Sequence, residues 1–271
     1  MSIIENDSAA IESLISAVEA ADSASLLVTA MENLAATQQP AAIPTLIAAL
    51  SYNNPGAAVA AVDGLIQIGE PAVDPILAQL DGHNYTARAW AIRALAGIGD
   101  PRGLVTLLGA ATADFALSVR RAAAKGLGSM KWHWFPADLL EIAQEEALES
   151  LLFVAQQDDE WIVRYAAVVG LQNLTGAITH YPEWKTQIQT ALDGIIFQDT
   201  SWAVRARALQ AQQQLRAGLM PIAQLPENIP NIDWQEILDT LYARKGVERD
   251  QVLAGDPRNY KKLTSELESS L

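Results

Sequence analysis

Small and apolar residues recur through the middle of the chain with the spacing of an α-helix. In each copy of the pattern they fall at positions i, i+3, i+4 and i+7 or i+8, which form one stripe along a helix. Five segments carry the pattern and align without gaps: AAVAAVDGL (57–65), ARAWAIRAL (87–95), VRRAAAKGL (119–127), VRYAAVVGL (163–171) and VRARALQAQ (204–212). Each segment therefore predicts a helix with one buried face.

A further apolar helix is predicted ahead of each copy, in AAIPTLIAAL, AVDPILAQL, GLVTLLGAA, ALESLLFVA and TALDGIIF. Gly and Pro in the connections, as in Ile98-Gly99-Asp100-Pro101, end one helix and start the next. The copies start 30, 32, 44 and 41 residues apart, which is typical of solenoids built from helix pairs. We therefore predict an all-α superhelix of HEAT-like helical repeats. Its second helices should cover 57–68, 86–98, 117–129, 161–174 and 202–216 and line the inner curve.

The two ends and one connection depart from the repeat. A weaker helical stretch, 10–36, is expected to cap the N-terminal end, and residues 130–146 are interpreted as an insertion that lengthens one spacing. The pattern stops near residue 218, so we predict a solenoid over 1–218, a Pro-containing linker over 219–231 and a C-terminal helical extension over 232–271.

Capping signals predict the helices of the extension. Asp233 and Glu236 form a D-x-x-E capping box ahead of a helix near 234–244. Another helix is expected after Asp256-Pro257, because proline favours the first turn of a helix.

Charge and composition narrow the classes of partner. The chain has 18 basic and 32 acidic residues, a net charge of −14, which argues against nucleic acid and against anionic membrane surfaces. It has no cysteine, and no run of about 18 apolar residues that would span a membrane. The acidic N-terminus lacks the basic segment of a signal peptide, so we expect a cytoplasmic protein.

An acidic residue precedes an arginine by six positions in three units, as Asp114 and Arg120, Asp158 and Arg164, and Asp199 and Arg205. In another unit Asp81 precedes Arg88 by seven. Repetition at equivalent positions predicts an architectural ladder of ion pairs or helix caps between stacked units. Substrate binding is the alternative interpretation for these arginines.

Other charges break the repeat and are candidates for binding. Arg93 and Lys125 occupy equivalent positions in their helices, away from the apolar stripe, and Arg121 shares a helix face with Lys125. These three residues predict a basic spot on an otherwise acidic protein. The alternative is that they are ordinary solvated charges.

Aromatic residues cluster near the same units. Tyr85 and Trp90 lie in one second helix, and Trp132 and Trp134 lie in the insertion, where tryptophan favours an interface or ligand contact. The alternative is that aromatic rings fill gaps between helices of unequal size, which we favour for Trp161 and the equivalent Trp202.

The sequence contains none of the common catalytic or metal-binding motifs considered below. His83, His133 and His180 are scattered, and no HExxH, GxGxxG, GxxxxGK[ST] or GxSxG occurs. From the residues alone, we expect a helical-repeat binding protein with no metal site.

Several longer segments resemble a known family. YNNPGAAVAAVDGLIQIGE (52–70), HNYTARAWAIRALAGIGDPR (83–102), DFALSVRRAAAKGLG (114–128) and DEWIVRYAAVVGLQ (159–172) are similar to the F-type subunit of cyanobacterial phycocyanobilin lyases, the CpcE/CpcF family. The resemblance covers about residues 10–215. It implies a heterodimer with an E-type subunit, a carbon–sulfur lyase active only as that pair. The pair attaches phycocyanobilin through a thioether to a cysteine of the phycocyanin α subunit, during phycobilisome assembly in the cytoplasm.

The resemblance implies which ligand the candidate residues would bind. A bilin has two propionates and a flat conjugated body, which suit Arg93, Arg121 and Lys125 for the charges and Tyr85, Trp90, Trp132 and Trp134 for the rings. The bilin is the substrate, and no permanently bound cofactor is expected. A general acid would help to protonate it; Asp81, His83 and His133 are candidates, and no catalytic residue is identified.

Two departures from the family are visible. Isomerising relatives carry a His-Cys pair in an early loop, whereas the matching residues here are Asn53-Asn54-Pro55-Gly56, which implies attachment without isomerisation. The tail, about 216–271, shows no resemblance that we can identify. A non-catalytic HEAT-repeat adaptor that escorts or dismantles phycobiliproteins is the competing hypothesis.

Overall fold

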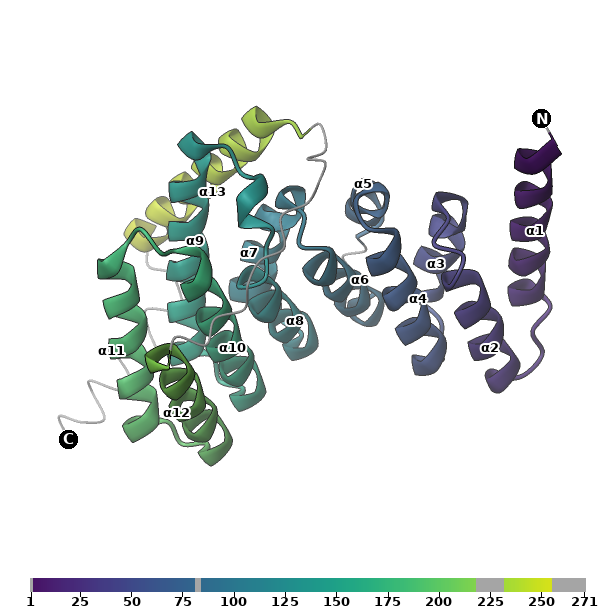
Figure 1. Ribbon diagram of the computed structural model, residues 1–271. Coiled ribbons are helices and arrows are strands. Elements are labelled where there is room, and N and C mark those ends of the chain that lie inside the picture. Colours follow the sequence, from purple (N-terminus) through teal and green to yellow (C-terminus); the bar gives the residue numbers. More distant parts are fainter. Residues whose placement is uncertain (1, 81–83, 218–231, 255–271) are drawn as a thin grey trace. The chain divides into compact units, whose positions relative to one another are not determined.

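The computed structural model describes residues 2–80, 84–217 and 232–254, and every regular element in these ranges is a helix (Figure 1). The chain separates into two compact units, Met1–Pro230 and Asn231–Leu271. None of the described helices is both long and apolar enough to cross a membrane.

The first unit is a stack of helix pairs. Its first helices are α1 (Ser2–Glu19), α3 (Ile43–Ala49), α5 (Val73–Ala78), α7 (Leu104–Ala113), α9 (Ala137–Gln157) and α11 (Pro182–Gln198). Its second helices are α2 (Ala24–Ala35), α4 (Pro55–Ile68), α6 (Tyr85–Ile98), α8 (Leu117–Leu127), α10 (Trp161–Ala177) and α12 (Trp202–Arg216). Each second helix packs on the next second helix, so α2, α4, α6, α8, α10 and α12 form one continuous layer.

This arrangement confirms the predicted helical-repeat solenoid. All five predicted second helices are present, and α6 and α12 end at the predicted residues. The stretch 10–36, predicted to cap the N-terminal end, holds α2 and the second half of α1, which form a further helix pair. The prediction that the second helices line the inner curve stays a prediction.

The interpretation of 130–146 as an insertion is wrong over most of its length. A 3₁₀ turn, η4 (Trp132–Trp134), comes after α8, and α9 already begins at Ala137. Leu139 and Ala143 are buried in line with Ala147 and Leu151, because the same apolar stripe runs through the whole helix. The 44-residue spacing therefore reflects a first helix of 21 residues.

Local signals explain where the helices start and stop. The side chains of Asn54 and Asn84 accept hydrogen bonds from the N–H groups of Ala57 and Ala87, which caps α4 and α6. After α6 the chain turns at Gly99, whose φ of 69° is accessible to glycine at little cost.

The backbones of α8 and α10 approach each other closely at two glycines. A Cβ atom added to Gly128 would overlap the carbonyl oxygen of Gly170, and one added to Gly170 would overlap the carbonyl oxygen of Ala124. The second-helix layer is therefore tight here because these positions have no side chain.

The second unit contains α13 (Trp234–Ala254) among its described residues. The N–H group of Glu236 donates to the side chain of Asp233 at 3.1 Å, which confirms the predicted N-cap. The helix extends ten residues beyond the predicted end at 244. The predicted linker, 219–231, and the helix expected after Asp256-Pro257 lie outside the described residues. The division into 1–218, 219–231 and 232–271 stays a prediction.

Candidate functional site on helices α6 and α8

A ladder of buried ion pairs connects successive units, as the repeated charges predict. Arg88 of α6 binds Asp114, with its Nε 2.6 Å from Oδ2 and its Nη2 3.2 Å from Oδ1. In the same geometry Arg120 of α8 binds Asp158, with Nε 2.6 Å from Oδ2 and Nη2 3.1 Å from Oδ1. The arginine always comes from a second helix and the aspartate from the turn ahead of the next second helix. The predicted architectural ladder is confirmed at these positions, but the prediction is wrong for Arg205 of α12, which forms no ion pair with a carboxylate of the described residues and instead donates to the carbonyl oxygen of Ile196.

In the third rung the arginine also binds the turn ahead of its own helix, as Arg120 does in the second. Arg164 of α10 binds both carboxylate oxygens of Asp199 at 2.7 and 2.9 Å, and its Nη1 donates to the carbonyl oxygens of Asp158 and Asp159. Asp199 in turn accepts a hydrogen bond from the N–H group of Ser201 at 2.7 Å. Burial alone would raise the pKa of Asp199, but the hydrogen bonds from Arg164 and Ser201 lower it below its ordinary value.

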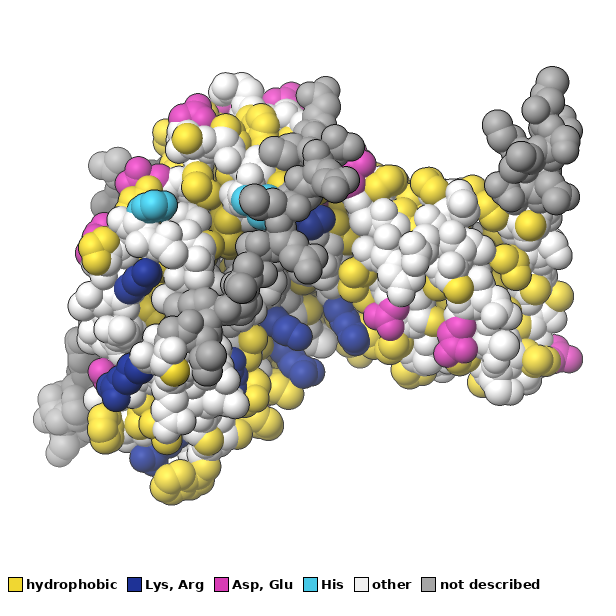
Figure 2. Space-filling model, viewed as in Figure 1, with side chains coloured by type: hydrophobic (Ala, Val, Ile, Leu, Met, Phe, Trp, Pro, Cys, Tyr) yellow, Lys and Arg dark blue, Asp and Glu magenta, His cyan; other side chains and the backbone are white. Residues whose placement is uncertain are grey.

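Arg93, Arg121 and Lys125 are cations that take no part in this ladder. All three side chains are exposed, Arg93 on α6 and the other two on the adjacent α8. None of them forms an ion pair with a carboxylate of the described residues. Figure 2 shows Lys and Arg side chains gathered over these two helices. We call these three residues the basic face.

Two aromatic residues lie on α6 with the basic face. The guanidinium carbon of Arg93 is 5.4 Å from the ring centroid of Trp90, which places the cation against the ring. Tyr85 begins α6 and is 54% exposed. Its ring makes an edge-to-face contact with the ring of Phe115, with the two ring centroids 6.3 Å apart. The structure therefore brings basic and aromatic side chains together on α6.

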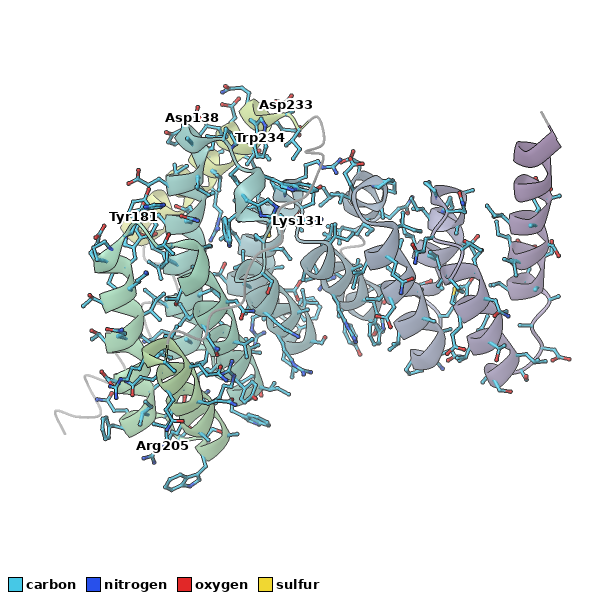
Figure 3. All side chains as sticks on the ribbon, in the orientation of Figure 1. Lys131, Asp138, Tyr181, Arg205, Asp233 and Trp234 are labelled. Atoms are coloured by element: carbon cyan, nitrogen blue, oxygen red, sulfur yellow. The ribbon has the colours of Figure 1, made fainter. Side chains whose placement is uncertain are left out.

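Trp132 and Trp134, which the sequence places in the predicted insertion, are buried in a turn. They are only 6% and 5% exposed, within η4. The ring of Trp132 stacks on Phe135 with centroids 5.4 Å apart. The Nζ atom of Lys131, which is labelled in Figure 3, lies 4.3 Å from the ring centroid of Trp134. Their ring faces are thus already occupied, and their predicted binding role stays a prediction.

The candidate acids give no defined catalytic group. Burial, and then the nearby ammonium of Lys131, lower the pKa of His133 below its ordinary value, so its imidazole is neutral at pH 7. Asp81 and His83 lie outside the described residues. Within the described residues, no group of three or more His, Cys, Asp or Glu could hold a metal ion.

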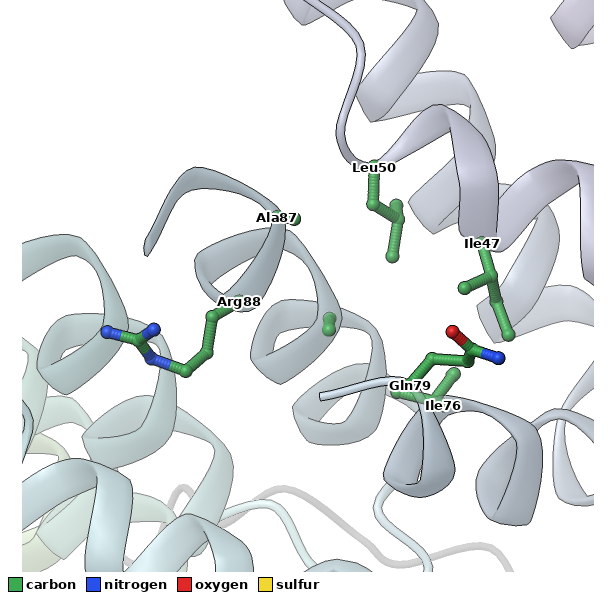
Figure 4. Close-up of a pocket in the computed structure, with 7 residues that line it drawn as sticks. Ile47, Leu50, Ile76, Gln79, Ala87 and Arg88 are labelled. Atoms are coloured by element: carbon green, nitrogen blue, oxygen red, sulfur yellow. The ribbon is translucent and has the colours of Figure 1, made fainter. Parts of the chain in front are cut away.

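A pocket between α3, α5 and α6 is too small for a tetrapyrrole (Figure 4). Its cavity volume is about 30 Å³, which is room for one or two water molecules. It is lined by Ile47, Leu50, Ile76, Gln79, Ala87, Arg88 and Ala91. This pocket is therefore not a candidate site for the bilin.

One further cation of the second-helix layer was not among the predicted binding residues. Arg207 of α12 is half-buried, donates to the side-chain oxygen of Gln172 on α10, and has one buried Nη1 atom without a hydrogen-bond partner. Burial lowers the pKa of this guanidinium. The signal was present in the sequence: Arg207 occupies a stripe position where the third and fourth units have Ala122 and Ala166.

Stacked helix pairs joined by an Asp–Arg ladder define a HEAT-repeat protein, here with a basic face on α6 and α8. The family of HEAT repeats matches residues 73–172, and the family of the PBS lyase HEAT-like repeat matches residues 26–52. More specifically, the chain belongs to the family of phycocyanobilin lyase beta subunits. It is 58% identical over 268 residues to the phycocyanobilin lyase subunit beta of Pseudanabaena tenuis, covering 93% of this chain and 95% of the relative.

Two other comparisons agree. The chain is 51% identical over 210 residues to the phycobilisome maturation protein of Synechococcus elongatus, covering 76% of this chain and 98% of that protein. A chain in the structure of the complex of CpcE and CpcF of phycocyanin lyase from Nostoc matches with a TM-score of 0.60 and 52% identity, covering 64% of this chain and 99% of that one.

The C-terminal extension is part of the likeness to one of these relatives. The match to the Pseudanabaena protein covers 93% of the chain, which is more than residues 1–218 alone can supply. The tail, which showed no identifiable resemblance, is therefore shared at least in part with that relative.

Proposed function

We propose that this protein is the F-type subunit of a heterodimeric lyase that attaches phycocyanobilin to a cysteine of the phycocyanin α subunit. The observation that carries the proposal is the 58% identity over nearly the whole of a relative named phycocyanobilin lyase subunit beta. The match to a chain of the CpcE and CpcF complex supports an E-type partner. The protein would act where phycobilisomes are assembled.

The proposed reaction suits a protein without cysteine. The acceptor supplies the thiol, its sulfur adds to the vinylic carbon of the bilin, and the thiol proton ends on the bilin. A carbon–sulfur bond forms and no group leaves, so the addition needs no oxidant or reductant. The lyase then contributes mainly by holding the two reactants in a productive orientation.

The basic face supplies the contacts for such orientation. Arg93, Arg121 and Lys125 would bind the two propionates of the bilin, since exposed cations without carboxylate partners among the described residues can do so. Tyr85 and Trp90 would contact the conjugated rings from the same helix, α6.

Trp132 and Trp134 would support the basic face indirectly, because the start of η4 is hydrogen-bonded to the residue that caps the end of α6. The N–H group of Lys131 donates to the carbonyl oxygen of Gly99 at 2.8 Å. The two rings hold this turn in place through their own packing.

A non-catalytic adaptor is the second candidate, and one observation favours it. His133, the one candidate general acid among the described residues, has a lowered pKa, and a neutral imidazole is a poor proton donor. Such an adaptor would hold bilin or phycocyanin while another protein joins them.

Reconstitution separates the two functions. This chain, an E-type subunit, the phycocyanin α subunit and phycocyanobilin are combined, and each is omitted in turn. Bilin that stays on the α subunit after denaturation is measured by mass and absorbance. A lyase subunit predicts covalent product only when both subunits are present. Equal product without this chain contradicts the proposal and supports the adaptor.

A further inference from the structure

The helices α8 and α10 lie in register along their length. Near their N-terminal ends Arg120 binds Asp158, with Nε 2.6 Å from Oδ2. Near their C-terminal ends the side-chain amide of Asn173 donates to the hydroxyl of Ser129 at 3.0 Å. Residues one and two helical turns before Ser129 and Asn173 therefore lie side by side on the same face. These pairs are Lys125 with Val169 and Arg121 with Tyr165.

The chemical character of this face changes from one helix to the next. The helices α6 and α8 supply the three cations of the basic face, whereas the equivalent stripe of α10 is uncharged and consists of Tyr165, Val169 and Asn173. Tyr165 is 36% exposed, although residues 166–168 after it are buried. Aromatic residues therefore flank the cations, with Trp90 on α6 and Tyr165 on α10.

The ring of Tyr165 is open to a ligand. Unlike the ring of Tyr85, it makes no contact with another aromatic ring of the described residues. The equivalent residue of α12 is Ala206, which is too small to cover it. Hydrogen bonds hold α10 from its other side, because Gln172 accepts from Arg207 and donates to Gln214 of α12. Such a fixed face loses little conformational freedom when a ligand binds.

The order of groups on this face matches the order of groups along a linear tetrapyrrole. A bilin carries its two propionates on the two central rings, and its outer rings are flat and uncharged. Packed helices are about 8–10 Å apart, so α6 and α10 are separated by roughly 16–20 Å, which is room for four linked pyrrole rings in an extended chain.

We propose that Tyr165 contacts an outer ring of the bilin, so that the tetrapyrrole lies across α6, α8 and α10. Its central propionates would then meet the basic face, and its other outer ring would lie on the side of Trp90. The identity of the ligand rests on the proposed function. Tyr165 would thus recognise a part of the ligand that carries no charge.

Removing the ring of Tyr165 tests the proposal. Tyr165→Ala and Tyr165→Phe are each titrated with phycocyanobilin as the full-length chain in complex with the E-type subunit, and binding is followed by visible absorbance. Tyr52→Ala is the matched control, because Tyr52 is also 36% exposed but lies in the turn ahead of α4. Tyr165→Ala should weaken binding roughly two- to tenfold, the effect of losing one aromatic contact, whereas Tyr165→Phe and Tyr52→Ala should bind like the wild type.

A second probe separates the ring contact from the charges. The dimethyl ester of phycocyanobilin keeps the rings and has no propionate charge. Tyr165→Ala should weaken the acid and the ester by the same factor, whereas Arg121→Glu should weaken the acid alone.

Each other result has a definite meaning. If Arg121→Glu weakens the acid but Tyr165→Ala weakens neither probe, the ring contact is wrong while the basic face stands. If Tyr165→Phe weakens binding as much as Tyr165→Ala, the hydroxyl group and not the ring is responsible, which also overturns the proposal. A wild-type heterodimer that binds no bilin overturns this proposal and the proposed function together. A heterodimer that binds bilin through Tyr165 but attaches none to the phycocyanin α subunit contradicts the proposed function alone.

Discussion

Replacing Arg164 by alanine should destabilise the solenoid more than any exposed charge substitution. Arg164 and Asp199 form an ion pair whose side chains are only 10% and 5% exposed. The substitution removes two hydrogen bonds to the carboxylate and two to the carbonyl oxygens of Asp158 and Asp159. It also leaves the carboxylate of Asp199 buried without its ion-pair partner, with Arg205 as a further cation that lowers its pKa but forms no ion pair with it.

The expected magnitude comes from that unpaired charge. Removing one partner of a buried ion pair costs about 3–5 kcal/mol of the free energy of unfolding. For a unit of this size, each kcal/mol lowers Tm by roughly 2–4 °C, so the expected loss is roughly 6–20 °C. A double variant, Arg164→Met with Asp199→Asn, removes the unpaired charge and keeps a side-chain oxygen that accepts from the N–H group of Ser201, and it should recover much of the loss.

Thermal unfolding followed by circular dichroism measures these differences. Arg121→Ala is the matched control, because Arg121 is exposed and forms no ion pair with the described carboxylates, and it should change stability by about 0.5 kcal/mol or less. If Arg164→Ala melts within about 2 °C of the wild type, the ladder does not hold the units together and the reasoning is refuted.

Three further predictions concern the same unit. The pKa of Asp199 is lowered in the folded state, so its contribution to stability is complete above the unfolded value of about 3.9 and is lost as pH falls through the lower folded value; between pH 5 and pH 3 the free energy of unfolding in urea should fall more in the wild type than in Asp199→Asn, and an equal fall in both would contradict this contribution. Gly170→Ala should cost about 1–3 kcal/mol because its Cβ would overlap α8, whereas Gly194→Ala, with nothing within 4 Å, should stabilise the chain by about 0.5–1 kcal/mol, and equal urea midpoints for the two would contradict the close approach. Arg207→Met removes a half-buried cation that has no carboxylate partner among the described residues and should leave the urea midpoint unchanged or raise it; a loss above about 1 kcal/mol would show that the cation is stabilising.

Features that repeat along the chain could be predicted from the sequence. The helix period of the small residues identified the five second helices from α4 to α12, and the recurring Asp and Arg identified the ladder, because each signal is present several times in equivalent positions. The residues of the basic face were also visible, since Arg93, Arg121 and Lys125 lie off the apolar stripe and are exposed in the structure.

Features that occur once were harder to predict. The start of α9 at Ala137 was missed because its first turns have no counterpart in the shorter first helices of other units. The burial of Trp132 depends on how η4 packs, which its local sequence does not specify. The unpaired state of Arg205 depends on which element packs against the outer side of α12, and the repeat pattern alone predicted another rung.

The central claim is that the basic face of α6 and α8 holds the bilin while the heterodimer attaches it. The most direct measurement compares bilin binding and the initial rate of covalent attachment for the wild-type heterodimer and for one carrying Arg93→Glu and Arg121→Glu. Lys185→Glu, on α11, serves as a control for a charge reversal elsewhere. Hydrogen bonds to charged groups are worth about 1.5–3 kcal/mol, so losing one propionate contact should weaken binding roughly ten- to a hundredfold and slow attachment, with an unchanged melting temperature. Attachment at the wild-type rate would contradict the claim and would place the bilin elsewhere, most directly on the partner subunit.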